Sequence, residues 1–353
     1  MNEPVLIQRE GPVGRISLNR PQALHALTQR MCEDISVALL GWREDTRVEA
    51  VILDHAEGRG FCAGGDVAEV RRSALEDGGR SGRAFFRAEY RMNHLLFTYP
   101  KPVVAFMDGV TMGGGVGLAL PCRWRVATPN TLFAMPEGAI GLFPDVGAGW
   151  FLPRLKGRIG QFLALTGARL DGAECLWAGL ATHWLPLEAL PQAKARIGRN
   201  PKMIEAILDE RAGEAPPARL AANAEPIARL FASDRLEGVL AALADDPSDW
   251  AARELEAVAA KCPTTAKVAL RQFAASRADF AAEMELEYRL ATRMMLRADF
   301  AEGVRAVLVD KDNAPNWSPS AAEAVADEML DAIFAPLPAG EEWTPFPDPS
   351  SRT

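Results

Sequence analysis

The sequence predicts an α/β fold followed by a helical C-terminal region. As far as about Ile159, short apolar runs typical of buried strands alternate with stretches of helical periodicity, which is the pattern of an α/β core. Beyond that residue, strand patterns thin out and helical periodicity dominates. The chain has 353 residues, 48% of them hydrophobic and 24% charged, which is enough for a large core in one or two domains.

Two kinds of pattern define the elements of the first half. Leu27, Met31, Ile35 and Leu39 repeat every four residues and predict one face of a helix. The run EDGGRSGR at 76–83 is the most linker-like segment and is expected to be mobile. The predicted strands are 5–8, 15–18, 50–53, 103–107, 125–128 and 132–135, and the predicted helices are 23–43, 67–75 and 84–97.

The second half reads as helices joined by short loops. Phe280, Met284, Tyr288, Ala291 and Met295 form an apolar stripe that we interpret as core packing. We expect an active-site core at 1–200, a helical region at 201–335 and an irregular tail at 336–353, with a loop at 211–219. The predicted helices are 158–166, 187–197, 201–210, 219–246, 249–260, 264–276, 279–297 and 300–310.

Composition argues against several classes of function. A net charge of −8 gives no support for a general nucleic-acid or membrane-surface role, although a local basic patch for a phosphorylated ligand stays open. The five cysteines are widely spaced with no CxxC pair, which favours a reducing compartment. The N-terminus lacks a signal-peptide pattern, and no apolar run approaches the roughly 20 residues of a membrane helix. We therefore expect a soluble, cytoplasmic protein.

Two glycine loops each follow a predicted buried strand. GFCAGGD comes after the strand at 50–53, and TMGGGVG comes after the strand at 103–107. Glycine lets successive peptide N–H groups point into a cleft, and a following helix N-terminus adds positive potential. Two such loops could place two N–H donors around one oxygen, although tight turns in close-packed backbone are the alternative.

Two isolated acids follow the second loop. Glu137 lies between a proline and a glycine in an apolar segment, and Asp145 follows Phe143-Pro144. Carboxyls in apolar surroundings have raised pKa values, which suits general acid or base work near neutral pH. Asp145 could instead cap the segment that carries Trp150. From its helical spacing alone, Glu89 reads as a surface or ion-pair residue.

The sequence contains no motif for nucleotide binding, metal binding or a serine nucleophile. Neither glycine loop matches a nucleotide fingerprint, because Leu118 stands where G-x-G-x-x-G would need glycine. The four histidines show no metal-ligand spacing, and His25 and His183 read as structural. No GxSxG sequence occurs. We expect neither a metal nor a cofactor.

The motifs resemble those of the crotonase superfamily of enoyl-CoA hydratases and isomerases. The resemblance rests on FCAGGD, KPVVAFMDGVTMGGGVG and the N-terminal LNRPQALHAL, and it covers nearly the whole chain. The run LFAMPEGAIGLFPDVGAGWFLPRL looks most like the 3-hydroxyisobutyryl-CoA hydrolase branch. This resemblance implies a spiral of ββα units, with a C-terminal helical region that helps to cover an acyl-CoA.

The resemblance also assigns roles to residues. The peptide N–H groups of Gly65 and Gly114 would hold the thioester oxygen. The first glutamate of hydratases would lie at Gly117 and is missing, whereas the second matches Glu137. The hydrolase branch pairs that glutamate with an aspartate, which matches Asp145, and has a substrate-contacting glutamate, which matches Glu89.

The CoA end of the substrate is assigned by the same resemblance, with CoA itself counted as part of the substrate. Many relatives carry a lysine where Gln22 stands, so one phosphate contact is expected to be lost, and Lys311 is the candidate replacement. The residues expected along the adenine and pantetheine are Gln22, Ala23, Leu24, Ala63 and Asp66.

The resulting prediction is hydrolysis of 3-hydroxyisobutyryl-CoA, or a close 3-hydroxyacyl-CoA, to the free acid and CoA. Glu137 would activate water or attack the carbonyl, and Asp145 would orient water, protonate the thiolate or bind the substrate hydroxyl. Two alternatives stay open: an isomerase or hydratase acting on another acyl-CoA, and a non-catalytic acyl-CoA-binding protein. A homo-oligomer is also open, since superfamily members are often trimers or pairs of trimers.

Overall fold

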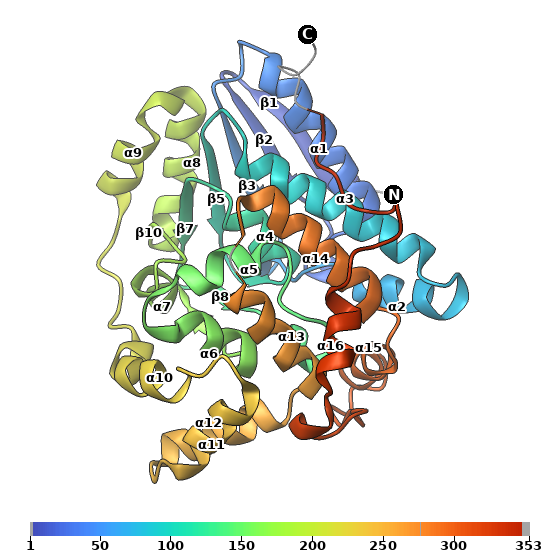
Figure 1. Ribbon diagram of the computed structural model, residues 1–353. Helices are drawn as coiled ribbons and strands as arrows, with labels where there is room; N and C mark the ends of the chain where they lie inside the picture. The colour runs from blue at the N-terminus through green and yellow to red at the C-terminus, as the bar shows by residue number, and fades with distance from the viewer. Residues whose placement is uncertain (1–2, 276, 348–353) are drawn as a thin grey trace.

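The fold consists of two small sheets wrapped by helices, as seen in a computed structural model that describes residues 3–275 and 277–347 (Figure 1). The larger sheet has the strand order β1-β2-β3-β5-β7-β10, and the smaller one has the order β4-β6-β8-β9. The two sheets alternate along the chain: β3, β5 and β7 of the larger sheet are followed directly by β4, β6 and β8 of the smaller one. With the helices that separate these pairs, this is the expected spiral of ββα units.

The larger sheet carries most of the core. β1 (Val5–Glu10) and β2 (Val13–Leu18) form an antiparallel hairpin, and the remaining pairs are parallel. Strands buried on both faces read as continuous apolar runs, which explains why the central strands could be found in the sequence. The remaining strands are β3 (Ala50–His55), β5 (Val103–Met107), β7 (Trp124–Ala127) and β10 (His183–Trp184).

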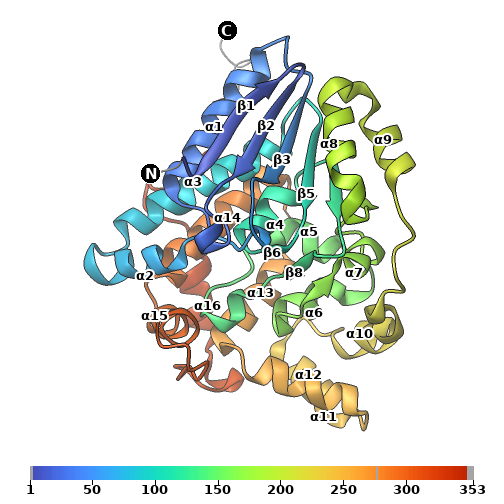
Figure 2. The same cartoon turned by 180° about the vertical axis from the view of Figure 1, so that it is seen from behind.

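The two faces of the larger sheet are covered by different parts of the chain. Ile52, Val104 and Phe106 pack against α8 (Leu190–Arg199) and α9 (Ile204–Arg211), while Leu53 and Ala105 face the main core. On that second side, α3 (Arg80–Phe97) lies between α1 (Gln29–Glu44) and α14 (Phe280–Met294), as Figure 2 shows from behind. A C-terminal helix therefore contributes to the core of the spiral.

The smaller sheet was only partly foreseen. It comprises β4 (Gly60–Cys62), β6 (Val110–Met112), β8 (Leu132–Ala134) and β9 (Leu170–Asp171). Of these strands only β8 was predicted, within the apolar run 132–135, whereas β4, β6 and β9 are runs of two or three residues that show no period of their own. Each of the first three strands ends where a functional loop begins, so this sheet lines up the two glycine loops and the segment that carries Glu137.

Two predictions in the first half were wrong at helix ends. The helix expected from residue 23 starts at Gln29, because Leu24 and His25 have left-handed φ values of 47° and 59° and Thr28 provides the N-cap. The expected linker at 76–83 is instead a tight connection from α2 (Val67–Glu76) into α3. There the Asp77 carboxylate accepts hydrogen bonds from Ser73 Oγ at 2.6 Å and the Arg80 N–H at 2.7 Å.

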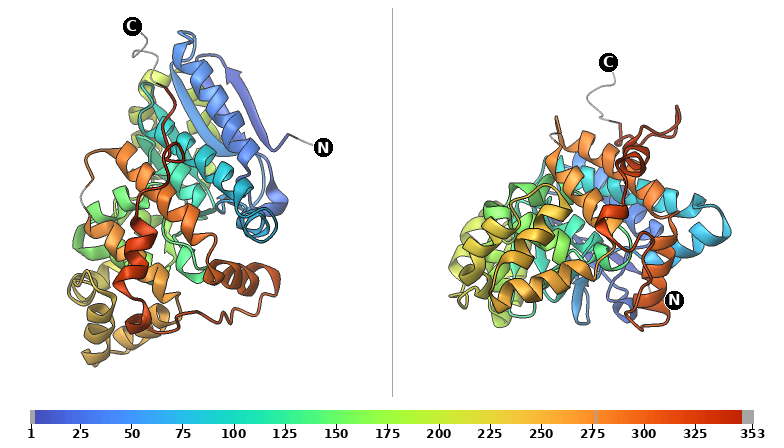
Figure 3. Two further views of the ribbon diagram at one scale, coloured as in Figure 1. Left: turned by 45° about the vertical axis from the view of Figure 1, so that its right-hand side comes forward. Right: turned by 60° about the horizontal axis from the view of Figure 1, so that its bottom comes forward.

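The helical second half agrees with the sequence apart from breaks and two helices, Gly172–Trp177 and Asp327–Phe334, that were not predicted. The apolar stripe from Phe280 to Met295 is buried as predicted. The stretch 219–246 is divided into a 3-10 turn and two helices, and the predicted helix 264–276 ends with a residue, 276, that lies outside the described part of the chain. The helices are α6 (Ile159–Thr166), α7 (Gly172–Trp177), α10 (Ala224–Leu230), α11 (Leu236–Asp245), α12 (Asp249–Ala259), α13 (Pro263–Ala274), α15 (Ala298–Val304) and α16 (Asp327–Phe334). In the left view of Figure 3, most of these helices lie below the larger sheet.

The C-terminal segment runs back along α3. No helix or strand occurs in 336–347, as expected for the tail, and 348–353 lie outside the described residues. Arg87 donates to the carbonyl oxygens of Glu341 and Glu342, and Trp343 is buried. The segment therefore packs against the helix that carries Glu89.

Candidate active site

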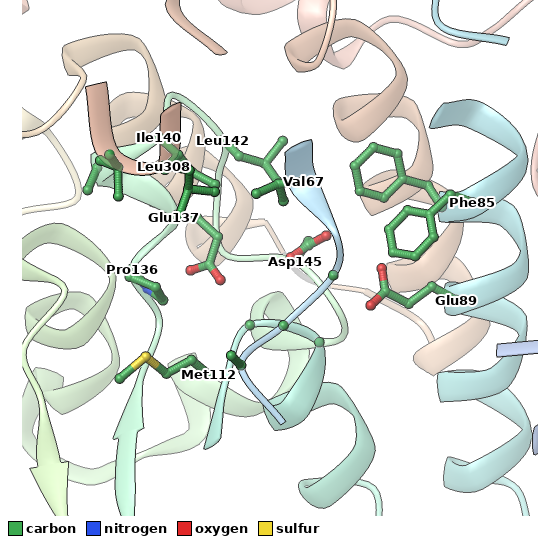
Figure 4. Close-up of a pocket in the computed structure, with 18 of the residues that line it drawn as sticks. Val67, Phe85, Glu89, Met112, Pro136, Glu137, Ile140, Leu142, Asp145 and Leu308 are labelled. Atoms are coloured by element: carbon green, nitrogen blue, oxygen red, sulfur yellow. The ribbon is translucent and has the colours of Figure 1, made fainter. Parts of the chain in front are cut away.

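A cavity of about 270 Å³ lies where the two glycine loops meet the segment after β8. It is lined by Gly64 and Gly65 from the first loop, by Gly113 and Gly114 from the second, and by side chains of α3, the 136–145 segment and residues 307–308 (Figure 4). Arg169 and Leu308 of its lining are exposed, whereas the carboxyl groups at its other end are buried. The cavity is therefore open at the Arg169–Leu308 end.

The glycine loops present two peptide N–H groups at this cavity. The Leu27 N–H donates to Gly64 O at 2.7 Å and the Asp66 N–H donates to Leu27 O at 2.8 Å, so the N–H of the intervening Gly65 points to the opposite side. Gly114 is the first residue of α4 (Gly114–Ala119), where N–H groups have no acceptor within the helix.

The two loops touch so closely that side chains are excluded. A Cβ atom at Gly114 would lie 3.2 Å from the Gly65 nitrogen and 2.4 Å from Glu89 Oε1. A Cβ at Gly65 would lie 2.7 Å from the Phe85 ring. Only glycine allows this approach of two loops and a carboxyl group.

Three carboxyl groups from three separate segments face the cavity (Figure 4). Glu89 comes from the middle of α3, Glu137 from the one-turn 3-10 helix Glu137–Ala139, and Asp145 from the loop after it. They are only 2%, 4% and 4% exposed, and within 3–275 and 277–347 none forms an ion pair with a lysine, arginine or histidine. The interpretation of Glu89 as a surface or ion-pair residue is therefore wrong.

These acids are buried without a neighbouring cation, which raises their pKa values. Burial raises the pKa of Glu137 well above its usual range, and the Asp145 charge raises it further. The pKa of Glu89 is raised in the same way, by burial and then by Asp145 and Glu137. Burial raises the pKa of Asp145 to about 6, against a hydrogen bond from Tyr90 that lowers it. The site thus holds acids that can exchange protons near neutral pH.

Tyr90 is a site residue that the sequence analysis did not single out. Its hydroxyl donates to Asp145 Oδ2 at 2.7 Å, and the ring is buried. The capping alternative for Asp145 is wrong, because the N-cap of α5 (Ala148–Phe151) is Gly147, and the side chain that accepts from the N–H groups at this helix start is Glu287. The position of Tyr90 next to Glu89 on an apolar helix face was the only signal in the sequence.

The absence of an acid at residue 117 has a packing reason. A Cβ at Gly117 would lie 2.5 Å from Val146 Cβ and 2.8 Å from Asn93 Nδ2. The Asn93 amide also donates to Gly117 O at 3.0 Å. Val146, directly after Asp145, thus fills the space that a side chain at 117 would need.

The residues expected to bind CoA are not all at the cavity. Ala63 lines it, and its N–H donates to Leu24 O at 2.9 Å. Gln22, Ala23 and Leu24 form or follow the 3-10 turn Pro21–Ala23 outside the lining. Two further residues also lie outside it: Asp66, which pairs with Arg20 at 2.8 Å, and the exposed Lys311.

Both histidines expected to be structural have structural partners. The Arg20 N–H donates to His25 Nδ1 at 2.9 Å, and His25 Nε2 bonds to Glu57 O at 2.9 Å. His183 bonds to Thr182 and Asp209. Among the described residues no group of three or more histidine, cysteine or acidic side chains is arranged to hold a metal ion, and no helix there is long and apolar enough to cross a membrane.

A ββα spiral whose two glycine loops adjoin an acid-lined cavity is the architecture of a crotonase-type acyl-CoA enzyme. A sequence model of the enoyl-CoA hydratase/isomerase family matches residues 13–334. The chain belongs to the enoyl-CoA hydratase/isomerase family.

Relatives within the family carry two kinds of name. The chicken protein named 3-hydroxyisobutyryl-CoA hydrolase, mitochondrial, is 42% identical over 94% of this chain and 89% of its own, and its human counterpart is 40% identical over 95% and 89%. Among solved structures, a carnitinyl-CoA dehydratase from Mycobacterium thermoresistibile superposes with a TM-score of 0.91 at 36% identity, over 97% of this chain and 99% of that one. An enoyl-CoA hydratase from Rhodobacter sphaeroides gives 0.89 at 39% identity, over 97% and 100%.

Proposed function

We propose that the protein hydrolyses the thioester of 3-hydroxyisobutyryl-CoA, or of a close 3-hydroxyacyl-CoA, to the free acid and CoA, a step of valine breakdown. The observation that carries the proposal is the pair Glu137 and Asp145 in one cavity, with Val146 packed where a hydratase acid at 117 would need space. The names of the relatives that are about 40% identical over nearly the whole chain support the same reaction.

The N–H groups of Gly65 and Gly114 are the proposed oxyanion hole. Both line the cavity, both are free of an acceptor within their own element, and the two loops are in contact. The oxygen of the thioester carbonyl gains negative charge when a nucleophile attacks its carbon. Two donors held by packed glycine backbone stabilise that charge without reorganising, and in other enzymes the loss of one donor costs about 3–4 kcal/mol.

Two routes through Glu137 are consistent with its position. As a base, it takes a proton from a water molecule that attacks the carbonyl carbon. As a nucleophile, its carboxylate forms a mixed anhydride as the CoA thiolate leaves, and water then cleaves the anhydride. In both routes one water is consumed and the thiol leaves with one proton. Asp145 orients the water, protonates the thiolate or binds the substrate hydroxyl.

Isotope-labelled water distinguishes the two routes. After a single turnover in labelled water, label in the Glu137 carboxyl group supports the anhydride route, because only an anhydride lets water attack the carbonyl of that residue. Direct attack leaves the label only in the released acid. Mass spectrometry of the peptide that contains Glu137 reads the result.

Glu89 is the proposed contact to the acyl group. Its Oε1 atom is buried and has no hydrogen-bond partner among the described residues, and it lies beside the backbone of Gly114. Because its pKa is raised, Glu89 keeps its proton to higher pH than an ordinary glutamate, and in its protonated form it can donate to a hydroxyl or carbonyl oxygen. The reaction needs no cofactor, since CoA is part of the substrate.

The nucleotide end of the substrate is proposed to leave the cavity through its open end. Gln22, Ala23, Leu24, Ala63 and Asp66 remain the proposed adenine and pantetheine contacts, with Lys311 for a phosphate. Arg169 adds a candidate, since it lines the open end and its charge adjoins that of Lys261. The side chain of Lys261 lies along Gly138 and reaches Gly167 with its Cε atom. Within 3–275 and 277–347, neither Arg169 nor Lys261 pairs with a carboxylate.

A second candidate is hydration or isomerisation of an enoyl-CoA, which the names of the two superposed structures favour. A thiol-release assay over a panel of 3-hydroxyisobutyryl-CoA, 3-hydroxypropionyl-CoA and crotonyl-CoA separates the candidates. We expect thiol from the hydroxyacyl thioesters and no loss of the enoyl absorbance. Loss of that absorbance without thiol would support the second candidate, and CoA binding without any turnover would support a non-catalytic protein.

Location and assembly remain proposals. We propose a cytoplasmic enzyme, although the vertebrate relatives carry the word mitochondrial in their names. Self-association into a homo-oligomer is the remaining proposal on partners, and light scattering would determine its stoichiometry.

A further inference from the structure

The turn that carries Asp145 has a backbone conformation that needs support. Val146 and Gly147 have consecutive positive φ values of 55° and 92°. The left-handed region is unfavourable for a β-branched residue such as valine, so this conformation persists only where surrounding contacts hold it. The contacts that hold it come from α14, about 140 residues further along the chain.

Glu287 on α14 accepts hydrogen bonds from the backbone of this turn. Its Oε2 atom accepts from the Gly147 N–H at 2.8 Å, and its Oε1 atom accepts from the Gly149 N–H at 3.2 Å. Gln272 Nε2 donates to Oε1 at 3.0 Å and completes the set of donors. Both N–H groups belong to the start of α5, where donors lack partners within the helix, so the carboxylate binds the backbone of the turn at two points.

A second carboxyl on the same helix makes a useful contrast. Glu283 lies one turn before Glu287, is equally buried, and accepts from the same Gln272 Nε2 at 2.9 Å. It also pairs with Arg277 at 3.5 Å, and its Oε1 atom lies close to Gly149. Unlike Glu287, it forms no described hydrogen bond with the 145–149 backbone.

We propose that Glu287 is the positioning residue for Asp145: through the Gly147 and Gly149 peptide groups it fixes the turn that aims the Asp145 carboxyl at the substrate. The inference rests on the proposed role of Asp145 in thioester hydrolysis. Glu287 is not among the residues that line the cavity, so it acts on the substrate through the turn and not by contact.

Several charged groups face this carboxyl. They are Asp145 on the turn, Glu283 on the same helix, Tyr90 on α3, and, by way of Glu283, Arg154 and Arg277. Burial raises the pKa of Glu287 well above its usual range and the two acids raise it further, while the two N–H bonds act in the opposite direction. Glu287→Gln loosens this buried turn, and freer access of water to the Asp145 carboxyl lowers its pKa from about 6.

The test compares Glu287→Gln with Glu283→Gln, after thiol release has been established for the wild type. In Glu287→Gln, the amide has one oxygen and one NH2 group, so the NH2 group must face one of the two backbone N–H donors. In Glu283→Gln, the amide oxygen can still accept the hydrogen bond from Gln272. We expect kcat to fall at least thirtyfold in Glu287→Gln, with KM within threefold of the wild-type value. The limb of the kcat/KM profile against pH that Asp145 governs should move to lower pH. Glu283→Gln should keep kcat within threefold and an unmoved profile, with a similar Tm, and Glu287→Asp should recover part of the loss. Equal kinetics and equal pH profiles in the two glutamine variants would overturn the proposal.

Hydrogen exchange of the unmodified protein gives an independent readout, even where a variant fails to fold. In the segment 145–150, the Ala148 and Trp150 amides donate to backbone carbonyls of the turn, and the Gly147 and Gly149 amides donate to Glu287. We expect slow exchange at Gly147 and Gly149 in addition to that of the two backbone-bonded amides. Exchange of that whole peptide at the rate of an exposed loop would overturn the proposal. Absence of thiol release by the wild type would instead count against the proposed function. The exchange result would still report on the hydrogen bonds from Gly147 and Gly149 to Glu287.

Discussion

The Tyr90 hydroxyl donates a 2.7 Å hydrogen bond to Asp145 Oδ2, and both side chains are buried. This bond joins Asp145 to α3, the helix that also carries Glu89. It is also the one side-chain hydrogen bond that opposes the effect of burial on the pKa of Asp145.

Tyr90→Phe is therefore expected to raise the pKa of Asp145 above its value of about 6. Loss of a donor to the charged form disfavours ionisation. Whichever limb of the kcat/KM profile Asp145 governs should move to higher pH, whether the residue acts as base or as acid. The matched control is Tyr99→Phe, because Tyr99 donates to Leu39 O away from the cavity. An unmoved profile in Tyr90→Phe would contradict the assignment.

Glu89→Gln should stabilise the fold at neutral pH while it lowers activity. The pKa of Glu89 is raised in the folded state, so the folded protein binds a proton more tightly than the unfolded chain, and stability falls as pH rises above about 4.3. A neutral amide of similar shape avoids this cost. We expect Tm to rise by about 2–4 °C at pH 8 and by less at pH 5. Glu188→Gln, at an exposed position, is the control; an equal Tm change at both pH values would refute the prediction.

Gly117→Glu should destabilise the protein and should not create a hydratase. Its Cβ would overlap Val146 at 2.5 Å, and overpacking of this kind costs about 1–3 kcal/mol or more. Thermal unfolding measures the cost, and the absorbance of crotonyl-CoA measures hydration. Gly41→Glu is the same change in α1 where a Cβ meets nothing within 4 Å. A stable Gly117→Glu protein that hydrates crotonyl-CoA would show that Val146 does not exclude the acid.

The double variant Arg169→Met, Lys261→Met should weaken binding of the nucleotide end alone. We expect KM for the acyl-CoA to rise about tenfold with kcat within twofold, because each long side chain keeps its apolar stem and loses its charge. The corresponding acyl-pantetheine, which lacks the phosphates, should show no change. Lys202→Met, at a lysine near Glu49, is the control. A KM for acyl-CoA within twofold of the wild type would exclude these cations as phosphate contacts.

Local sequence patterns predicted the main elements and the residues that line the site, but not the contacts between segments that lie far apart in the sequence. The strands at 50–53 and 103–107, both glycine loops, Glu137 and Asp145 could be found because each stands in a short, distinctive segment. Strands β4, β6 and β9 of the smaller sheet could not, since their conformation depends on neighbours far away in the sequence. Glu287 was hidden for the same reason: its partners, Gly147 and Gly149, lie about 140 residues away.

One departure from pattern could have served as a signal. Glu283 and Glu287 lie four residues apart on one helix, a spacing at which like charges repel on an exposed surface. Both are fully buried, beside the apolar stripe that the sequence did reveal. Two acids at helical spacing within a buried helix point to partners that the local sequence does not contain.

The thiol-release rate of Glu137→Gln with 3-hydroxyisobutyryl-CoA tests the central claim most directly. Glutamine keeps the shape of the side chain but can neither take a proton from water nor attack a carbonyl. We expect at least a hundredfold loss of kcat, with calorimetric CoA binding close to the wild-type value and full activity in the control Glu188→Gln. Turnover by Glu137→Gln near the wild-type rate would contradict the account.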